Sequence, residues 1–200
     1  MWTALALAYH LASRLAYVGY VGFALKREER QAYFACRYGV EPGFRRFRRL
    51  AAVVMANDAL SFILVCVVTR QSLRLGVAPF VPIIGGALLV LLGVWVKLWA
   101  AARLGAKAYY WYNFFAPDAA GAPTRSGPYR YVKNPMYTLG YLHSYGVALA
   151  LGSWPGLVAA VFDQAAILAF YRWVEKPHFE KLTGADRVPP EQRVALRRRV

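Results

Sequence analysis

The sequence predicts an all-α membrane protein, a polytopic bundle of about five transmembrane helices in one domain. Hydrophobic residues make up 58% of the 200 residues, and the mean hydropathy is +0.31. They form solid blocks long enough to span a bilayer, whereas helices of a soluble domain usually show apolar stripes. Most charged residues lie in a few clusters between these blocks, which favours repeated membrane crossing.

The net charge of +15 is also explained by repeated membrane crossing. In a soluble protein it would suggest a nucleic-acid partner. Here the cations lie between apolar blocks, where the positive-inside bias places them, and we expect no nucleic-acid partner. The cysteines, Cys36 in a basic loop and Cys66 in an apolar block, do not predict a disulfide framework. No residue pattern predicts a metal site.

The first three spans are expected at about Trp2 to Leu25, Leu50 to Thr69 and Pro79 to Ala102, since a crossing needs about 20 apolar residues. The first block is interrupted by Arg14 and is longer than the apolar core of a signal peptide. We therefore interpret it as a helix of the mature protein.

The last apolar stretch, residues 136–174, is too long for one span. The sequence "GSWPG", residues 152–156, interrupts it with the glycine and proline residues of a tight turn. We predict a helical hairpin with spans of about Pro135 to Leu151 and Pro155 to Val174.

The distribution of cations predicts the orientation. The first, third and C-terminal inter-span segments hold 21 of the 25 Lys and Arg residues. With five spans, these segments share the cytoplasmic side and the N-terminus lies outside. We divide the single membrane domain of residues 1–200 into N-terminal spans (1–78), a catalytic core (79–184) and a basic tail (185–200) attracted to anionic lipid.

Some polar residues fall inside predicted spans, where they need a partner or a polar cavity. One explanation for these residues is purely structural: Arg14 forms an ion pair with Asp58 or Asp163 between helices. Asp58, near mid-membrane, is also a candidate for lining a lipid pocket, whereas Asp163 lies in the outer half of its span. Gly85, Gly86 and Gly93 allow close approach of a helix or a ligand along the third span, and we predict close helix packing.

The stretch "SGPYRYVKNPMYTLGY", residues 126–141, is the densest motif. Gly127 and Pro128 predict a turn. Pro135 suits the first turn of a helix, which places Asn134 at or next to the N-cap of the fourth span. A membrane-interface aromatic belt explains only some of the neighbouring tyrosines.

This stretch resembles the "GPYRYVRHPxY" motif of integral membrane methyltransferases that use S-adenosylmethionine, a group with isoprenylcysteine carboxyl methyltransferases and phospholipid methyltransferases. A second stretch, "VEKPHFEK" at residues 174–181, resembles the "ExPHxEK" element of the phospholipid branch. The resemblance covers about residues 100–182 and is strongest to phosphatidylethanolamine N-methyltransferases. Two features depart from it: Asn134 replaces a frequent His, and Lys176 follows Glu175 where a second acid is frequent, so that Glu180 is the alternative carboxylate.

The resemblance implies a cytoplasmic site for S-adenosyl-L-methionine. Cations suit anionic groups of cofactor and lipid, and aromatic faces suit a methylsulfonium. The implied cofactor-binding residues are Tyr129, Arg130, Tyr131, Asn134, Pro135, Tyr137, Gly140 and Glu175. The implied catalytic residues are Glu175, His178 and Glu180, with His178 or Glu180 accepting the amine proton. The implied substrate-binding residues are Lys133, Tyr141, Trp111 and Asp58. The structural alternatives are a helix-end contact for His178 and a solvated charge for Glu180.

The function implied is N-methylation of the phosphatidylethanolamine headgroup, as in phosphatidylcholine biosynthesis. Alternatives are methylation of an isoprenylcysteine carboxylate or small thiol, an NADPH-dependent reductase of the same membrane fold, and a non-enzymatic transport or accessory subunit. The abundance of Ala, Arg, Leu and Val favours a location in a bacterial inner membrane. The endoplasmic reticulum membrane is the eukaryotic alternative. The sequence does not fix the number of methylations or the oligomeric state.

Overall fold

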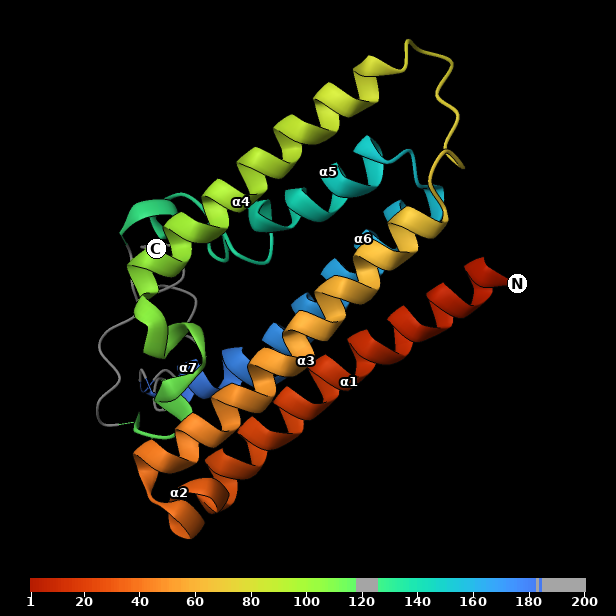
Figure 1. Ribbon diagram of the computed structural model, residues 1–200. Helices are drawn as coiled ribbons and strands as arrows, with labels where there is room; N and C mark the ends of the chain where they lie inside the picture. Colours follow the sequence, from red (N-terminus) through yellow and green to blue (C-terminus); the bar gives the residue numbers. More distant parts are fainter. Residues whose placement is uncertain (118–125, 183, 185–200) are drawn as a thin grey trace, which may run out of the picture.

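The computed structural model describes residues 1–117, 126–182 and 184, so the predicted basic tail lies outside the described residues. Within these ranges the chain is helical and contains no strand, which confirms the all-α prediction (Figure 1). The α-helices are α1 (Trp2–Gln31), α2 (Tyr33–Tyr38), α3 (Val40–Val68), α4 (Phe80–Tyr109), α5 (Leu142–Ala150), α6 (Trp154–Phe170) and α7 (Lys176–Leu182). Short 3-10 turns are η1 (Tyr112–Phe114), η3 (Gly127–Arg130) and η4 (Leu139–Tyr141), and η5 (Tyr171–Glu175) is a π-helical segment.

In the described part of the chain, three segments are long and apolar enough to cross a membrane: Val40–Val68, Phe80–Phe114 and Trp154–Leu182. They cover the second, third and fifth predicted spans except for the end residues Thr69 and Pro79. Neither α1 nor α5 meets the same criteria within the described chain. Large apolar side chains of α4, such as Leu91 and Leu98, are exposed, as expected for a helix that faces lipid.

The fourth predicted span differs most from the structure. Only Leu142–Ala150 is α-helical, and nine residues rise about 13 Å, less than half of the hydrocarbon core of about 30 Å. The residues before it form turns, in which the backbone N–H of Gly140 donates to the Pro135 carbonyl. The N-cap of α5 is Tyr141, so the prediction that Asn134 caps this helix is wrong.

Helix α3 begins ten residues before the predicted second span, at Val40. Arginine is a good helix former, so the basic segment continues the helix while Phe44 and Phe47 enter the core. The Glu28 carboxylate accepts hydrogen bonds from the backbone N–H groups of Phe34 (2.6 Å) and Ala35 (3.2 Å). It thereby satisfies donors at the start of α2, which a helix cannot pair internally.

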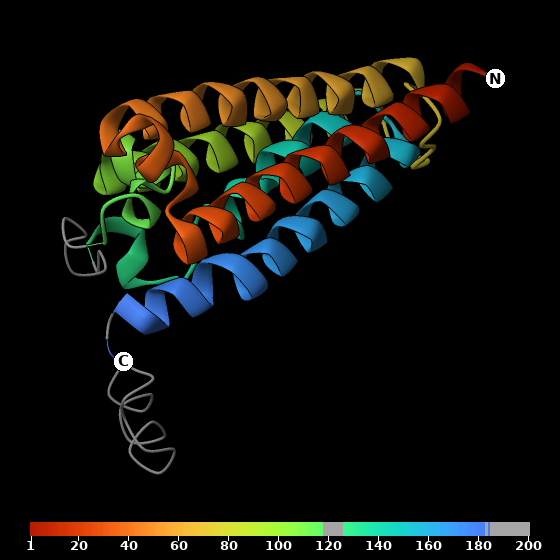
Figure 2. The same cartoon turned by 90° about the horizontal axis from the view of Figure 1, so that it is seen from below.

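Helix α5 packs against both α4 and α6, and its Ala148 shares a core cluster with Ala159 and Ala160 of α6. In Figures 1 and 2, α1, α3 and α6 lie together, while α5 lies along α4. A Cβ atom added at Gly86 would lie 2.5 Å from the carbonyl oxygen of Gly146, and one at Gly93 would clash with the backbone of His143. The predicted close packing along the third span is therefore confirmed at Gly86 and Gly93, and α5 is the helix that approaches.

Candidate functional site

Glu175 lies where the two sequence motifs meet. It ends the π-helical segment η5, a type of distortion frequent at functional sites, and its side chain is buried. Its Oε1 accepts hydrogen bonds from Trp111 Nε1 (2.5 Å) and from the Tyr137 hydroxyl (2.6 Å). Trp111 has a φ of 59°, an uncommon conformation for a bulky residue. Residues from three distant segments therefore meet at one carboxylate.

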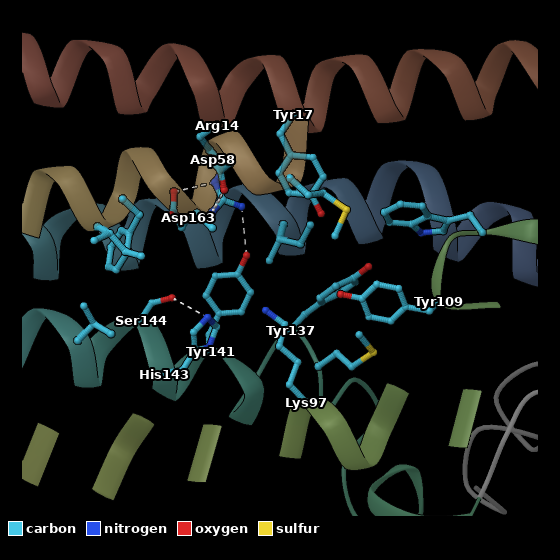
Figure 3. A pocket seen from close by; sticks show the side chains of 18 residues that line it. Arg14, Tyr17, Asp58, Lys97, Tyr109, Tyr137, Tyr141, His143, Ser144 and Asp163 are labelled. Atoms are coloured by element: carbon cyan, nitrogen blue, oxygen red, sulfur yellow. Dashed lines mark hydrogen bonds and ion pairs between the residues drawn. The ribbon is translucent and has the colours of Figure 1, made fainter. Parts of the chain in front are cut away.

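A cavity of about 190 Å³ is lined by both donors to Glu175, Trp111 and Tyr137. Figure 3 shows the residues around it. Four of the residues predicted to bind cofactor or substrate line it: Asp58, Trp111, Tyr137 and Tyr141. Sequence analysis missed Lys97, His143 and Tyr109, which also line it. Lys97 left a signal, because it is the only charged residue within the predicted third span.

The inner wall of the cavity is a buried ionic cluster centred on Arg14. The guanidinium pairs with Asp58 Oδ2 through Nη2 and with Asp163 Oδ1 through Nε, both at 2.7 Å. It also donates from Nη1 to the Tyr141 hydroxyl at 3.2 Å. The predicted pairing of Arg14 is confirmed, with both carboxylates at once. Through Arg14, Asp163 joins the cluster that holds motif residue Tyr141, although we expected it to lie away from the motif.

His10 completes this cluster. Its Nε2 lies 3.1 Å from Asp163 Oδ1 and its Nδ1 lies 2.9 Å from the Ser61 hydroxyl. One ligand atom each from His10, Asp58 and Asp163 lie within 4.8 Å of one another, a spacing that could suit a metal ion. The Arg14 guanidinium pairs with both carboxylates and supplies the positive charge there.

None of the three residues predicted to be catalytic lines the cavity itself: Glu175 reaches it only through its donors Trp111 and Tyr137, and His178 and Glu180 are held elsewhere. The His178 ring stacks on Phe114 with centroids 3.6 Å apart, and its Nδ1 lies 3.0 Å from Glu29 Oε1. Burial would raise the pKa of Glu29, but hydrogen bonds from His178 and Lys181 bring it below the ordinary value. Glu180 is partly exposed and lies 3.7 Å from Lys176. His178 and Glu180 therefore do not line the cavity, and His178 is held by Phe114 and Glu29.

The remaining motif residues come from the segment that precedes α5. Tyr129 is half-buried, and burial raises the pKa of its phenol. The Asn134 side-chain nitrogen is buried and has no hydrogen-bond partner among the residues described. Tyr131 is 76% exposed. Arg130 and Lys133 are exposed, whereas Pro135 and Gly140 are buried in the turns before α5.

Comparison with known proteins gives a consistent family signal. The model of the phospholipid methyltransferase family matches residues 81–186, just over half of the chain. A phosphatidylethanolamine N-methyltransferase of Schizosaccharomyces pombe is 30% identical over 141 residues, which cover 70% of this chain and 16% of that protein. A protein of the same name from Coccidioides posadasii is 34% identical over 151 residues, which cover 74% of this chain and 15% of that protein. A third such protein, from Paracoccidioides brasiliensis, is 38% identical over 113 residues, which cover 56% of this chain and 11% of that protein.

The chain therefore matches only about a sixth or less of the length of these three curated relatives. No solved structure matches it significantly.

Proposed function

The chain belongs to the phospholipid methyltransferase family, and from this premise we propose that it transfers a methyl group from S-adenosylmethionine to the amine of phosphatidylethanolamine. The observation that carries the proposal is the pair of hydrogen bonds from Trp111 and Tyr137 to Glu175. The bond from Tyr137 joins the two motifs of the family resemblance, and the bond from Trp111 adds a third segment, beside a cavity that also contains buried charges.

The residues around Glu175 fit the chemical groups of S-adenosylmethionine. A buried carboxylate among aromatic rings suits a sulfonium cation. The unpaired amide nitrogen of Asn134 is a donor for a ligand acceptor, and Arg130 and Lys133 suit a carboxylate or phosphate. When bound, the cofactor supplies an electrophilic methyl group. We propose that Tyr129, Tyr131, Pro135 and Gly140 complete this site.

Methyl transfer requires a neutral amine held in line with the methyl carbon, away from water. Trp111, Tyr137 and Tyr141 are the aromatic walls that exclude water in this proposal. His178 or Glu180 remains the proposed proton acceptor on the cytoplasmic side. Because His178 is stacked on Phe114 and bound to Glu29, that role would require it to leave both contacts.

We propose five membrane crossings, with the N-terminus outside and the site facing the cytoplasm of a bacterial inner membrane. The cation distribution supports the orientation. The fourth crossing then consists of α5 and the turns before it, paired with α6 as a hairpin. Non-helical backbone is tolerated at membrane depth where protein buries it, and Met136, Gly140 and Tyr141 are buried.

Radiolabelled S-adenosylmethionine and the purified protein in nanodiscs test this function. Phosphatidylethanolamine, its monomethyl and dimethyl forms and a farnesylcysteine analogue are the acceptors. We expect label in an ethanolamine lipid and its loss in Glu175→Gln, with Glu41→Gln as the comparison variant. Label found only in the farnesylcysteine analogue would show that the acceptor is a prenylcysteine carboxylate and not the lipid amine. Absence of both methyl transfer and cofactor binding would refute the enzymatic function.

A further inference from the structure

We propose that the cavity beside Arg14 is a subsite for a zwitterionic phospholipid headgroup. In this subsite, Asp58 Oδ1 accepts a hydrogen bond from the headgroup ammonium, and Lys97 pairs with the phosphate. The inference rests on the proposed function in taking an amine phospholipid as the substrate. It gives Asp58, which the sequence analysis expected to contact the substrate, a defined role at the ammonium, and it adds Lys97 as the group of opposite charge that selects this headgroup.

The first observation is an unpaired carboxylate oxygen. Asp58 is 4% exposed, and its Oδ2 pairs with Arg14. Its Oδ1 is fully buried and has no hydrogen-bond partner in the described part of the chain. Leaving a charged acceptor buried and unsatisfied is costly, above all inside a membrane span. Because Asp58 lines the cavity, a ligand there can supply the missing donor.

The second observation is the cation on the side of α4. Lys97 lines the same cavity, and its Nζ lies 5.5 Å from the centre of the Tyr141 ring. None of the described carboxylates forms an ion pair with it. The Tyr141 hydroxyl accepts a hydrogen bond from Arg14, so the Tyr141 side chain contacts both the Arg14 cluster and Lys97 (Figure 3). A phosphate at Lys97 would give this ammonium a paired anion.

The charge and size of the cavity both favour a headgroup. Two cations, Arg14 and Lys97, and two carboxylates, Asp58 and Asp163, line it, so their formal charges cancel. Such a wall matches a zwitterion better than a ligand with a large net charge. The volume of about 190 Å³ lies below the roughly 300–1,000 Å³ typical of drug-sized ligands. A phosphoethanolamine group suits this space better than a nucleoside cofactor does.

The cavity also offers a neighbouring surface for the acyl chains. Apolar residues of α3, Met55, Phe62 and Ile63, line it, and the Ile63 side chain is 47% exposed. The headgroup can therefore occupy the polar interior while the lipid tails stay along the outer face of α3. This arrangement keeps the amine in the cavity that Trp111 and Tyr137, the two donors to Glu175, also line.

Binding of short-chain lipids to the purified full chain tests the subsite without requiring turnover. Dihexanoyl phosphatidylethanolamine is compared with dihexanoyl phosphatidylglycerol, which has the phosphate but lacks the amine. We expect the wild type to prefer the ethanolamine lipid. We expect Asp58→Asn to lose at least ten-fold of its affinity for that lipid while its affinity for the glycerol lipid stays unchanged. Lys97→Met should weaken both.

Asn57→Ala is the matched control, because Asn57 lies next to Asp58, bonds Tyr9 and Ser13, and does not line the cavity. It should keep the lipid preference. If Asp58→Asn does not fold, Lys97→Met carries the test, since it removes no ion pair among the described residues. Unchanged affinities in Asp58→Asn or in Lys97→Met, or loss of the preference in Asn57→Ala, overturn the subsite.

Methyl transfer, measured separately on the same proteins, distinguishes the two proposals. Asp58-dependent lipid binding without any methyl transfer would leave the subsite and remove the proposed function. Methyl transfer to phosphatidylethanolamine at equal rates in wild type, Asp58→Asn and Lys97→Met would leave the function and remove the subsite.

Discussion

The Tyr137 hydroxyl donates a 2.6 Å hydrogen bond to Glu175 Oε1, across 38 positions of sequence. Tyr137 belongs to the turns before α5, and Glu175 ends the π-helical segment after α6. One contact therefore connects the two stretches that carry the family resemblance. Because the Trp111 indole donates to the same oxygen, the carboxylate is held from two sides.

Tyr137→Phe removes one of these donors and keeps the ring. A hydrogen bond to a charged group contributes about 1.5–3 kcal/mol, so we expect S-adenosylmethionine to bind roughly ten- to a hundred-fold more weakly. Titration calorimetry measures this. Tyr145→Phe is the control, because its hydroxyl donates to Gln164 Oε1 and Tyr145 does not line the cavity. Equal cofactor affinity in Tyr137→Phe and wild type would separate Tyr137 from the cofactor site.

Arg14→Met should be strongly destabilising. It leaves Asp58 and Asp163 as buried carboxylates without their common cation, and breaking a buried pair costs about 3–5 kcal/mol. Thermal unfolding in detergent should show a much lower melting temperature. Arg49→Met makes the same change at an exposed position and should stay within about 0.5 kcal/mol. Equal melting temperatures for the two variants would contradict a structural role of the cluster.

The helical class and the Arg14 pairing were predictable because each depends on strong local rules. Apolar blocks of spanning length indicate membrane helices, and charges inside such blocks need partners. The extent of α5 was not predictable in the same way. Hydropathy does not distinguish a helix from buried turns, and residues 135–141 are apolar enough to extend the helix in a sequence-based prediction.

The position of His178 was not predictable for a different reason. In a regular helix, residues three apart lie on one face, which suggests that His178 accompanies Glu175. In the structure both side chains do face the same segment, since Glu175 accepts a hydrogen bond from Trp111 and His178 stacks on Phe114. The partners that hold His178 away from the cavity, Phe114 and Glu29, come from distant parts of the chain, and sequence spacing does not predict them. Lys97 was overlooked because a lone lysine in an apolar block has no motif around it.

Gly86→Ala tests the contact between α4 and α5. The added Cβ would lie 2.5 Å from the Gly146 carbonyl oxygen and 2.6 Å from the Ala150 nitrogen, both backbone atoms that cannot rotate away. Overpacking of this kind costs about 1–3 kcal/mol, so we expect a lower melting temperature. Gly19→Ala is the control, since no atom lies within 4 Å of its added Cβ. That change in α1 should be neutral or stabilising, and equal losses in both variants would argue against close α4–α5 packing.

Glu29→Gln tests the contact between the end of α1 and α7 through its pH dependence. The pKa of Glu29 is lowered from 4.5 because hydrogen bonds from His178 and Lys181 outweigh the effect of burial. A carboxyl with a lowered pKa stabilises the folded state above its unfolded pKa, and this stability is lost as the pH falls through the folded pKa. We expect Glu29→Gln to melt below the wild type at pH 7, and the difference to shrink as the pH falls below the unfolded pKa of about 4.3 and to disappear below the folded pKa. Because Glu41 contacts Lys107 and Tyr112 instead, Glu41→Gln controls for general loss of a carboxylate. A melting difference for Glu29→Gln that persists unchanged under acidic conditions would show that packing, and not the ionised carboxylate, stabilises α7 against α1.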